Sequence, residues 1–276
     1  MIDFDLSKVE FSENDIKRNV IIPSKLTPEL AYFIGIHVGD GCLYLYKRKT
    51  CRTIDYNLSY YGHEIDELEF HKNYILPLIK RLFNIDVWIK TGHKGVIELC
   101  FRSKAVFYFL SRVIGLPVGS KKDIDVPHII KEADIDIKKA FLRGLADTEG
   151  CLTFKKRNKE KHYYPAISIG LQSKNLIYSV KRLLDYLKID SCVFYNLKSK
   201  RNGKINIKHQ IELNGEKNID VWFKILGFNS SKHLTKYSVW KNFGFCPPYT
   251  NIIERRKILK GEIDINSYYG PVAQPG

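Results

Sequence analysis

The sequence predicts an α+β protein made of two copies of one structural repeat, each with the order helix, strand, strand, helix, strand, strand, helix. A short pattern occurs twice, as LAYFIGIHVGDG at residues 30–41 and as KAFLRGLADTEG at residues 139–150. The segments after each copy recur in the same order, with small shifts in spacing that fall in turns. Apolar residues in these segments recur at every second position, as in strands, or at every third to fourth position, as in helices. The chain therefore contains an internal duplication.

Bulk properties limit the functional classes. The chain has 276 residues, 44% of them hydrophobic, which is enough for one large domain or two halves. Its 45 basic and 30 acidic residues give a net charge of +15, which favours a polyanion such as nucleic acid as partner. We see no apolar run long enough to span a membrane, no signal peptide and no metal-site spacing among the six cysteines. We therefore expect an intracellular, cytoplasmic protein with reduced thiols and no membrane partner.

Periodicity divides the chain into an N-terminal segment, two repeats and a C-terminal tail, at 1–27, 28–135, 136–237 and 238–276. Thr27 followed by Pro28 is typical of a helix start. Gly41 and Gly150 follow the two motif helices, and we expect both to take the left-handed conformation that ends a helix. The predicted elements of the first repeat are helices near 28–39, 65–83 and 103–114 and strands near 42–48, 56–62, 86–91 and 95–102. Those of the second are helices near 136–148, 173–187 and 216–226, with strands between them.

Small residues recur at every fourth position of both motif helices. Glycine inside a helix costs about 0.5–1 kcal/mol relative to alanine, so its presence on one face needs a reason. Close packing of the two helix backbones would supply that reason. Larger apolar residues flank the small ones and should face the core of each repeat. The predicted helix interface consists of Ala31, Gly35, Gly39, Ala140, Gly144 and Thr148.

Each motif ends in an acidic residue followed by glycine, Asp40 in the first copy and Glu149 in the second. Both acids lie at helix C-termini, where the helix dipole disfavours an anion unless a cation joins it. If the helices pair about a pseudo-two-fold axis, the acids emerge side by side. Two carboxylates with carbonyl oxygens form a hard-oxygen site for Mg²⁺ or Mn²⁺, which can promote phosphodiester hydrolysis. We therefore expect Asp40 and Glu149 to bind a catalytic divalent metal.

With these residues identified, the chain resembles the LAGLIDADG homing endonucleases. GIHVGDG and GLADTEG, with the apolar helix turns before them, are similar to the two motifs of that family. The resemblance covers nearly all of residues 28–232 and implies a monomeric, pseudo-dimeric protein whose antiparallel sheets form a saddle. In that family the corresponding acids bind the catalytic metal, and both DNA strands are cut across the minor groove. The resemblance thus implies a site-specific, Mg²⁺-dependent double-strand DNA endonuclease with a long asymmetric target, as in intron homing.

Four further residues are candidates for accessory catalytic roles. His63 and Gln172 occupy matched positions near strand ends, where relatives often place a glutamine, and we expect them to orient water or the scissile phosphates. Lys104 and Lys217 occupy equivalent positions at the start of the third helix of each repeat. They are candidates for the accessory catalytic lysine or for phosphate contacts. Leu152 stands where some relatives carry a basic residue just after the second motif.

Strand alternation separates a core face from an open face in each predicted sheet. In the first strand, Leu43 and Leu45 should point to the core, and Tyr44 and Tyr46 away from it. The open faces combine basic, amide, hydroxyl and aromatic side chains, which match the donors and acceptors of bases and phosphates. Because the two faces differ, the target should be asymmetric. The expected DNA-binding residues are Tyr44, Tyr46, Arg48, Arg52, Ser59, Tyr61, Arg102, Thr153, Lys155, Arg157, Ser168, Lys198, Arg201, Lys208 and Gln210.

Other functions stay open from the sequence. A protein of this fold could bind nucleic acid without cutting it, either as a maturase that helps an intron RNA to fold or as a non-cleaving DNA-binding protein. Both would need the basic open faces, but neither would need Asp40 and Glu149, so the presence of both acids favours the nuclease. An enzyme unrelated to nucleic acids is the remaining alternative, and no glycine-rich phosphate loop, Ser/His/Asp set or cofactor motif supports it.

Overall fold

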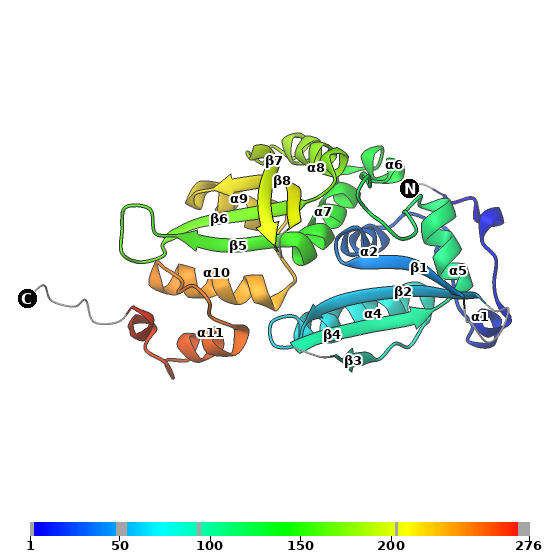
Figure 1. The fold of residues 1–276 in the computed structure, drawn as a ribbon, viewed down its shortest axis with the longest axis horizontal. Helices are drawn as coiled ribbons and strands as arrows, with labels where there is room; N and C mark the ends of the chain where they lie inside the picture. The colour runs from blue at the N-terminus through cyan, green and yellow to red at the C-terminus, as the bar shows by residue number, and fades with distance from the viewer. Residues whose placement is uncertain (1–2, 48–53, 93–94, 202–203, 270–276) are drawn as a thin grey trace, which may run out of the picture.

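Two four-stranded antiparallel sheets, one from each repeat, organise the computed structural model, which describes residues 3–47, 54–92, 95–201 and 204–269 (Figure 1). Neighbouring strands of the first sheet are, in order, β1 (Gly41–Lys47), β2 (Ile54–His63), β4 (Val96–Arg102) and β3 (Ile89–Thr91). Those of the second are β5 (Gly150–Lys155), β6 (Tyr164–Leu171), β8 (Lys204–Asn214) and β7 (Cys192–Arg201). Both repeats thus order their strands alike, which confirms the predicted α+β duplication.

The helices of each repeat pack on one face of its own sheet. The first repeat contains α2 (Pro28–Gly39), α3 (Leu68–Phe70), α4 (Leu76–Phe83) and α5 (Lys104–Tyr108), with π-helical turns at His71–Ile75 and Phe109–Val113. The second contains α7 (Ile135–Glu149), α8 (Lys174–Tyr186) and α9 (Glu216–Ile225), and α6 (His128–Lys131) leads into it. Within the described residues, no helix combines the length and the apolar composition needed to cross a lipid bilayer.

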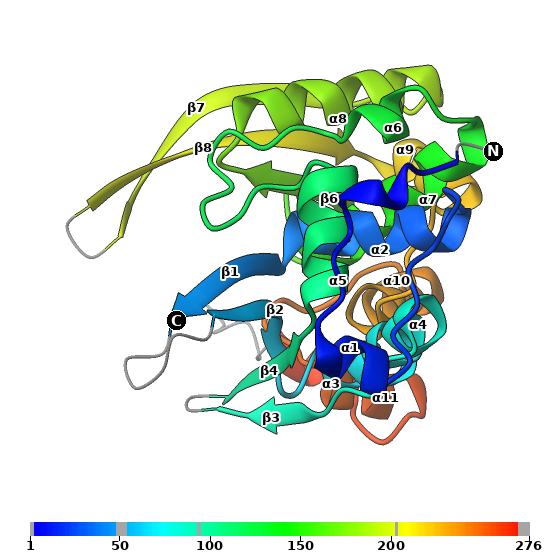
Figure 2. The same ribbon diagram turned by 90° about the vertical axis from the view of Figure 1, so that its right-hand side faces the viewer.

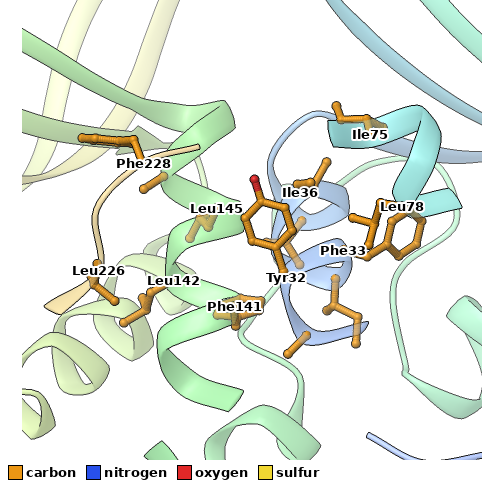
Figure 3. Close-up of a cluster of buried hydrophobic side chains, with 14 of the residues drawn as sticks. Tyr32, Phe33, Ile36, Ile75, Leu78, Phe141, Leu142, Leu145, Leu226 and Phe228 are labelled. Atoms are coloured by element: carbon orange, nitrogen blue, oxygen red, sulfur yellow. The ribbon is translucent and has the colours of Figure 1, made fainter. Parts of the chain in front are cut away.

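The motif helices α2 and α7 lie at the centre of the molecule. The first begins as predicted, because Thr27 Oγ1 accepts a hydrogen bond from the Leu30 amide at 3.2 Å. Apolar side chains on either side of the small residues then enter different cores: Phe33 lies toward Leu78 of the first repeat, and Leu142 lies toward Leu226 of the second (Figure 3). Each motif helix therefore ties one repeat to the other while completing the core of its own.

The glycines after the motif helices do not take the left-handed conformation that we expected. Gly150 has φ −74° and ψ 147°, and Gly41 also lacks a positive φ. A Cβ on Gly41 would lie 2.6 Å from His37 Cγ, and one on Gly150 would lie 3.1 Å from the Ala146 carbonyl carbon. Glycine is required because the chain enters the strand directly against the last helical turn, where a side chain has no room.

The two ends of the chain fold onto the repeats. The N-terminal segment contains a 3₁₀ turn (Leu6–Lys8) and α1 (Glu13–Lys17), whose Asp15 accepts hydrogen bonds from the backbone amides of Lys104 and Ala105 at 3.1 and 3.2 Å. After the second repeat come α10 (Ser231–Phe243), α11 (Ile252–Leu259) and a 3₁₀ turn (Ile265–Tyr268). The boundary that we drew at residue 238 therefore falls inside α10, which packs on β5.

Candidate active site between the two repeats

The small residues of α2 and α7 meet at the predicted helix crossing. A Cβ on Gly35 would lie 2.8 Å from the Leu145 amide nitrogen and would clash with the Phe141 carbonyl oxygen. Reciprocally, a Cβ on Gly144 would lie 3.0 Å from the Tyr32 carbonyl carbon. Backbone thus packs on backbone at both positions, so that the two helices approach each other more closely than side chains would allow. Ala31 is fully buried and Ala140 is half-buried in the same region.

This crossing brings the two predicted acids together. Asp40 is the C-cap of α2, and Glu149 is the last residue of α7. A Cβ on Gly39, next to Asp40, would lie 3.1 Å from Glu149 Cγ. Burial, the nearby Glu149 and Glu67 raise the pKa of Asp40 to about 7. Burial also raises the pKa of Glu149, against the opposing effect of Lys121 and Lys232. The site therefore concentrates negative charge that a cation would stabilise.

The donor set fits a hard divalent cation. Two partly buried carboxylates from different repeats converge, and a cation would relieve the cost of ionising both. No group of three or more His, Cys, Asp or Glu side chains suited to a metal occurs in the described part of the chain. Mg²⁺ is commonly held by one or two carboxylates, with water and substrate phosphate oxygens as its other ligands. Asp40 and Glu149 would therefore suffice as the protein's contribution to such a site.

Two half-buried lysines lie near the acids, and sequence reasoning did not find them. Lys121 Nζ donates hydrogen bonds to the carbonyl oxygens of Val38, at 3.0 Å, and Gly39, at the end of α2. Lys232 Nζ donates to Glu67 Oε1 at 2.9 Å. Burial lowers the pKa of Lys121. For Lys232 burial acts in the same direction, but the charge and hydrogen bond of Glu67 outweigh it and raise the pKa.

A signal for these lysines exists in the duplication. Lys121 lies shortly after the third helix of the first repeat, and Lys232 lies shortly after that of the second. Lys121 lies in the segment before α6, whereas Lys232 is the second residue of α10. At the spacing of 112 that matches Leu116 with Phe228, Lys121 falls one residue away from Lys232, on His233, so the duplication gives only an approximate match.

The lysines expected from the sequence lie elsewhere, and this expectation is corrected. Lys104 Nζ pairs with Glu10 at 2.8 Å and lies above the rings of Tyr56 and Tyr108. Lys217 lies in the first turn of α9, on the outer side of the second repeat beside Asp220. The start of the third helix points away from the helix crossing in both repeats. Equivalent positions in the duplication therefore did not imply a position near the acids.

His63 and Gln172 lie at matched strand ends but in different surroundings. Gln172 is exposed and lines a pocket of about 460 Å³ together with Glu149 and Lys121. His63 is also exposed, and its Nδ1 accepts hydrogen bonds from the amides of Ile65 and Asp66 at 3.3 and 3.4 Å. Gln172 thus lies with one acid, whereas the His63 ring organises the turn after β2.

Two polar residues of the motif helices are buried away from the acids. Asp147 accepts hydrogen bonds from Tyr32 Oη at 2.6 Å and from the amides of Asn229 and Ser230, both at 2.9 Å. Burial raises its pKa to about 7. His37 Nδ1 lies 2.8 Å from Tyr60 Oη, and burial lowers the pKa of this imidazole to about 3. Both residues therefore have structural partners.

The open faces of the sheets extend to the same side of the molecule, as Figure 2 shows. Tyr46 and Tyr61 are exposed on the first sheet, and Lys155 and Lys208 on the second. Of the other expected contacts, Arg102, Arg157 and Lys198 are exposed, and Tyr44, Thr153, Ser168 and Gln210 are half-buried. Arg48, Arg52 and the side chain of Arg201 lie outside the described residues.

Two sequence expectations about this surface are wrong. Ser59 is only 1% exposed, although it lies on the open face, because the Tyr44 side chain crosses over β2 to place its Oη 3.8 Å from Cys100 Sγ. Leu45 is 51% exposed, although we assigned it to the core. Its end of β1 extends beyond the helices that cover the sheet. Alternation predicts which face a side chain is on, but not how far its neighbours cover it.

Acidic side chains partly neutralise the basic ones on this surface. Lys155 pairs with Glu212 at 3.2 Å, and Arg102 lies 3.6 Å from Asp55. Tyr61 Oη donates to Glu98 Oε1 at 3.1 Å. A polyanion that bound here would compete with these carboxylates for the same cations. The surface therefore carries both positive and negative side chains, which favours binding to a specific site over non-specific binding.

Comparison with known proteins identifies the fold. Residues 136–227, most of the second repeat, match the family model of the LAGLIDADG-like domain. The LAGLIDADG homing endonuclease I-LtrWI, solved bound to its target DNA, is similar with a TM-score of 0.52 and 15% identity, over 80% of this chain and 90% of that chain. The meganuclease I-SmaMI, solved on uncleavable DNA, gives a TM-score of 0.50 and 14% identity, over 80% and 91%.

The curated relatives are much longer proteins than this chain. Glutamine–fructose-6-phosphate aminotransferase of Methanocaldococcus jannaschii is 24% identical over 217 residues, which cover 79% of this chain and 18% of that protein. This chain spans about a fifth of the length of the curated relatives that it matches. The second repeat thus matches the LAGLIDADG-like domain, and the two repeats together have the fold of the LAGLIDADG homing endonucleases.

Proposed function

We propose that this protein is a homing endonuclease that uses a divalent metal, Mg²⁺ or Mn²⁺, to cut both strands of a specific DNA site. The observation that carries the proposal is the convergence of Asp40 and Glu149, one from each repeat, with two half-buried lysines near them. A protein that only bound DNA or RNA would have no use for two carboxylates whose ionisation burial opposes.

The four side chains have separate tasks in this proposal. Asp40 and Glu149 would hold the metal, which when bound would supply water activation and charge neutralisation at the scissile phosphates. Lys121, beside Glu149 and Gln172, and Lys232, beside Glu67, would each stabilise the negative charge that develops on the oxygens of one phosphate. Gln172, which shares a pocket with Glu149 and Lys121, orients water or phosphate there. His63 supports the turn that carries Glu67 by accepting its backbone hydrogen bonds.

The open sheet faces then read the target. DNA would lie across both sheets with its minor groove above the acids, and each sheet would cover about one helical turn, roughly 20 bp in all. Backbone contacts fix the register, and base contacts made by side chains such as Lys208 and Gln210 give specificity. Because one chain supplies both halves, the protein acts as a monomer on an asymmetric site.

A selection that needs no knowledge of the target tests this function. The purified protein is incubated with a plasmid library of randomised inserts, with Mg²⁺ or with EDTA, and the linearised molecules are sequenced. We expect one recurrent asymmetric site that is cut only with Mg²⁺. Asp40→Asn and Glu149→Gln should bind that site but not cut it, whereas Asp136→Asn, at an exposed acid in the first turn of α7, should cut normally.

Two results would contradict the proposal. One is cutting that survives either acid substitution. The other is stable binding to structured RNA without any DNA cleavage, which would instead indicate a maturase.

A further inference from the structure

The helices after the second repeat form a small module that is docked on the first repeat. We define the C-terminal module as α10 and α11 with the loop between them. Its contacts converge on Asp66, Glu67 and Glu69, the turn that follows β2. The Ile252 amide donates to Asp66 Oδ1 at 2.8 Å, and Arg256 pairs with Glu69 at 2.6 Å. The module therefore bridges the repeats beside the acids.

Arg255 is the centre of this docking and is fully buried, with 0% of its surface exposed. Its guanidinium donates to Asp66 Oδ1 at 3.1 Å and to Thr235 Oγ1 at 2.9 Å, and it also donates to the Thr250 carbonyl oxygen. A buried charge costs free energy unless its partners are fixed in good geometry. Such a residue defines the relative position of the elements that it joins, here α10, α11 and the turn of the first repeat.

One of those elements carries Lys232. Arg255 Nη2 also lies 3.5 Å from the Lys232 carbonyl oxygen, so the backbone of this lysine is part of the same network. The Lys232 side chain then pairs with Glu67, the residue next to Asp66. Backbone and ammonium group are thus both held by the contact between the module and the first repeat.

The other lysine has no such support. Lys121 is held by the carbonyl oxygens of Val38 and Gly39 at the end of α2, without any residue of the C-terminal module. Where the first repeat has Glu67, the second has Leu176, which lines the pocket beside Lys121. The duplication is therefore asymmetric just where the two lysines are positioned.

We propose that Arg255 is a positioning residue for Lys232, and that the C-terminal module thereby controls the cleavage of one DNA strand and not the other. The inference rests on the proposed endonuclease function. Lys121 lines a pocket with Glu149 and Gln172 of the second repeat, whereas Lys232 pairs with Glu67 of the first repeat, so in this proposal each lysine serves a different phosphate. Loosening Lys232 should slow one of the two cuts, so that the enzyme accumulates a nicked product.

The test measures the two cuts separately. Plasmid carrying the selected site is followed from supercoiled to nicked to linear DNA, and duplex labelled on one strand or the other identifies the strand that is cut. Arg255→Met should slow one strand at least tenfold and leave the other within about twofold, and Lys232→Met should slow the same strand. Arg255→Lys should restore part of the rate, because it keeps the charge without the fork of donors.

A matched control separates positioning from general docking. Arg256→Met removes another ion pair between the module and the first repeat but none that touches Lys232, so both strands should be cut at the wild-type ratio. If Arg255→Met does not fold, Glu67→Gln replaces it, since that side chain holds the lysine from the first repeat. Glu67→Gln should change the rate on the same strand as Lys232→Met.

The outcomes distinguish the two claims. If the wild-type protein cuts no DNA, the proposed function fails and this inference fails with it. If the wild-type protein cuts, and folded Arg255→Met or Glu67→Gln slows both strands equally or neither, the inference alone is overturned.

Discussion

The surroundings of Asp40 and Glu149 differ, although the two acids end equivalent helices of one duplicated unit. Beside Asp40 lie Glu67 and its partner Lys232, backed by the C-terminal module. Beside Glu149 lies an open pocket of about 460 Å³ lined by Gln172 and Lys121. Where the helix backbones touch, by contrast, Gly35 and Gly144 make the same contact from opposite sides. Close packing has thus kept the repeats alike, whereas positions that need only charge or hydrogen bonding have diverged.

The acids should be equally important despite their unequal surroundings. Asp40→Asn and Glu149→Gln each leave a single carboxylate at a site built from two, so we expect either change to lower the rate of cutting on both strands by at least about a thousandfold. Strand-specific cleavage rates at saturating enzyme provide the measurement. If one acid affects only one strand, the site is two independent halves and not one shared centre.

Each lysine should affect the cleavage of one DNA strand, whereas each acid affects the cleavage of both. Lys121→Met and Lys232→Met should each slow one strand by about 10- to 100-fold. The affected strands should be opposite, because Lys121 lies with Gln172 of the second repeat and Lys232 with Glu67 of the first. Nicked intermediates labelled on either strand report the bias. An identical strand preference for both variants would be inconsistent with the pseudo-symmetric arrangement.

A substitution at the helix crossing should lower the stability by the same amount in either repeat. Gly35→Ala and Gly144→Ala each force a methyl group against the backbone of the partner helix, and we expect a loss of about 2–4 kcal/mol in the free energy of unfolding from this overpacking. Gly170→Ala is the control, because its Cβ would meet only side chains at 3.8 Å. Chemical denaturation measures all three. A large difference between Gly35→Ala and Gly144→Ala would show that the contact is not symmetric in energy.

The pH dependence of stability should show the free-energy cost of ionising Asp40 in the folded protein. Its folded pKa of about 7 exceeds the ordinary value of 3.8, so the folded state holds the proton more tightly than the unfolded state. Stability is therefore lost as the pH rises from about 4 to about 7. In metal-free buffer, Asp40→Asn should be more stable than the wild type by up to about 4 kcal/mol at pH 8, with no difference near pH 3.

Divalent metal provides the matching control for that pH effect. Mg²⁺ should raise the Tm of the wild-type protein at pH 8 and change that of Asp40→Asn much less, since only the former offers both carboxylates. If metal stabilises both proteins equally, the carboxylate pair is not the principal site.

The duplication made most of the fold and the acid pair predictable. The repeated GDG and TEG ends placed Asp40 and Glu149 at matched helix ends, and the small-residue stripe placed the helices together. Lys121 was not predicted because it lies in an irregular segment, and Lys232 was not predicted because it lies in the first turn of α10, beyond the helix and strand periods that repeat. The docking of Arg255 on Asp66 depends on a contact between the two ends of the fold, about which local periodicity carries no information. Likewise, the burial of Ser59 follows from the reach of Tyr44 across a neighbouring strand.

The central claim is that one carboxylate from each repeat binds the same metal site at the crossing of α2 and α7. A crystal structure of the protein with bound DNA and Mn²⁺, recorded at an X-ray energy where Mn scatters anomalously, tests it most directly. We predict an anomalous peak bonded to oxygens of both Asp40 and Glu149, with scissile phosphates beside Lys121 and Lys232. A fully occupied Mn²⁺ elsewhere, with no peak between these two carboxylates, would contradict the account.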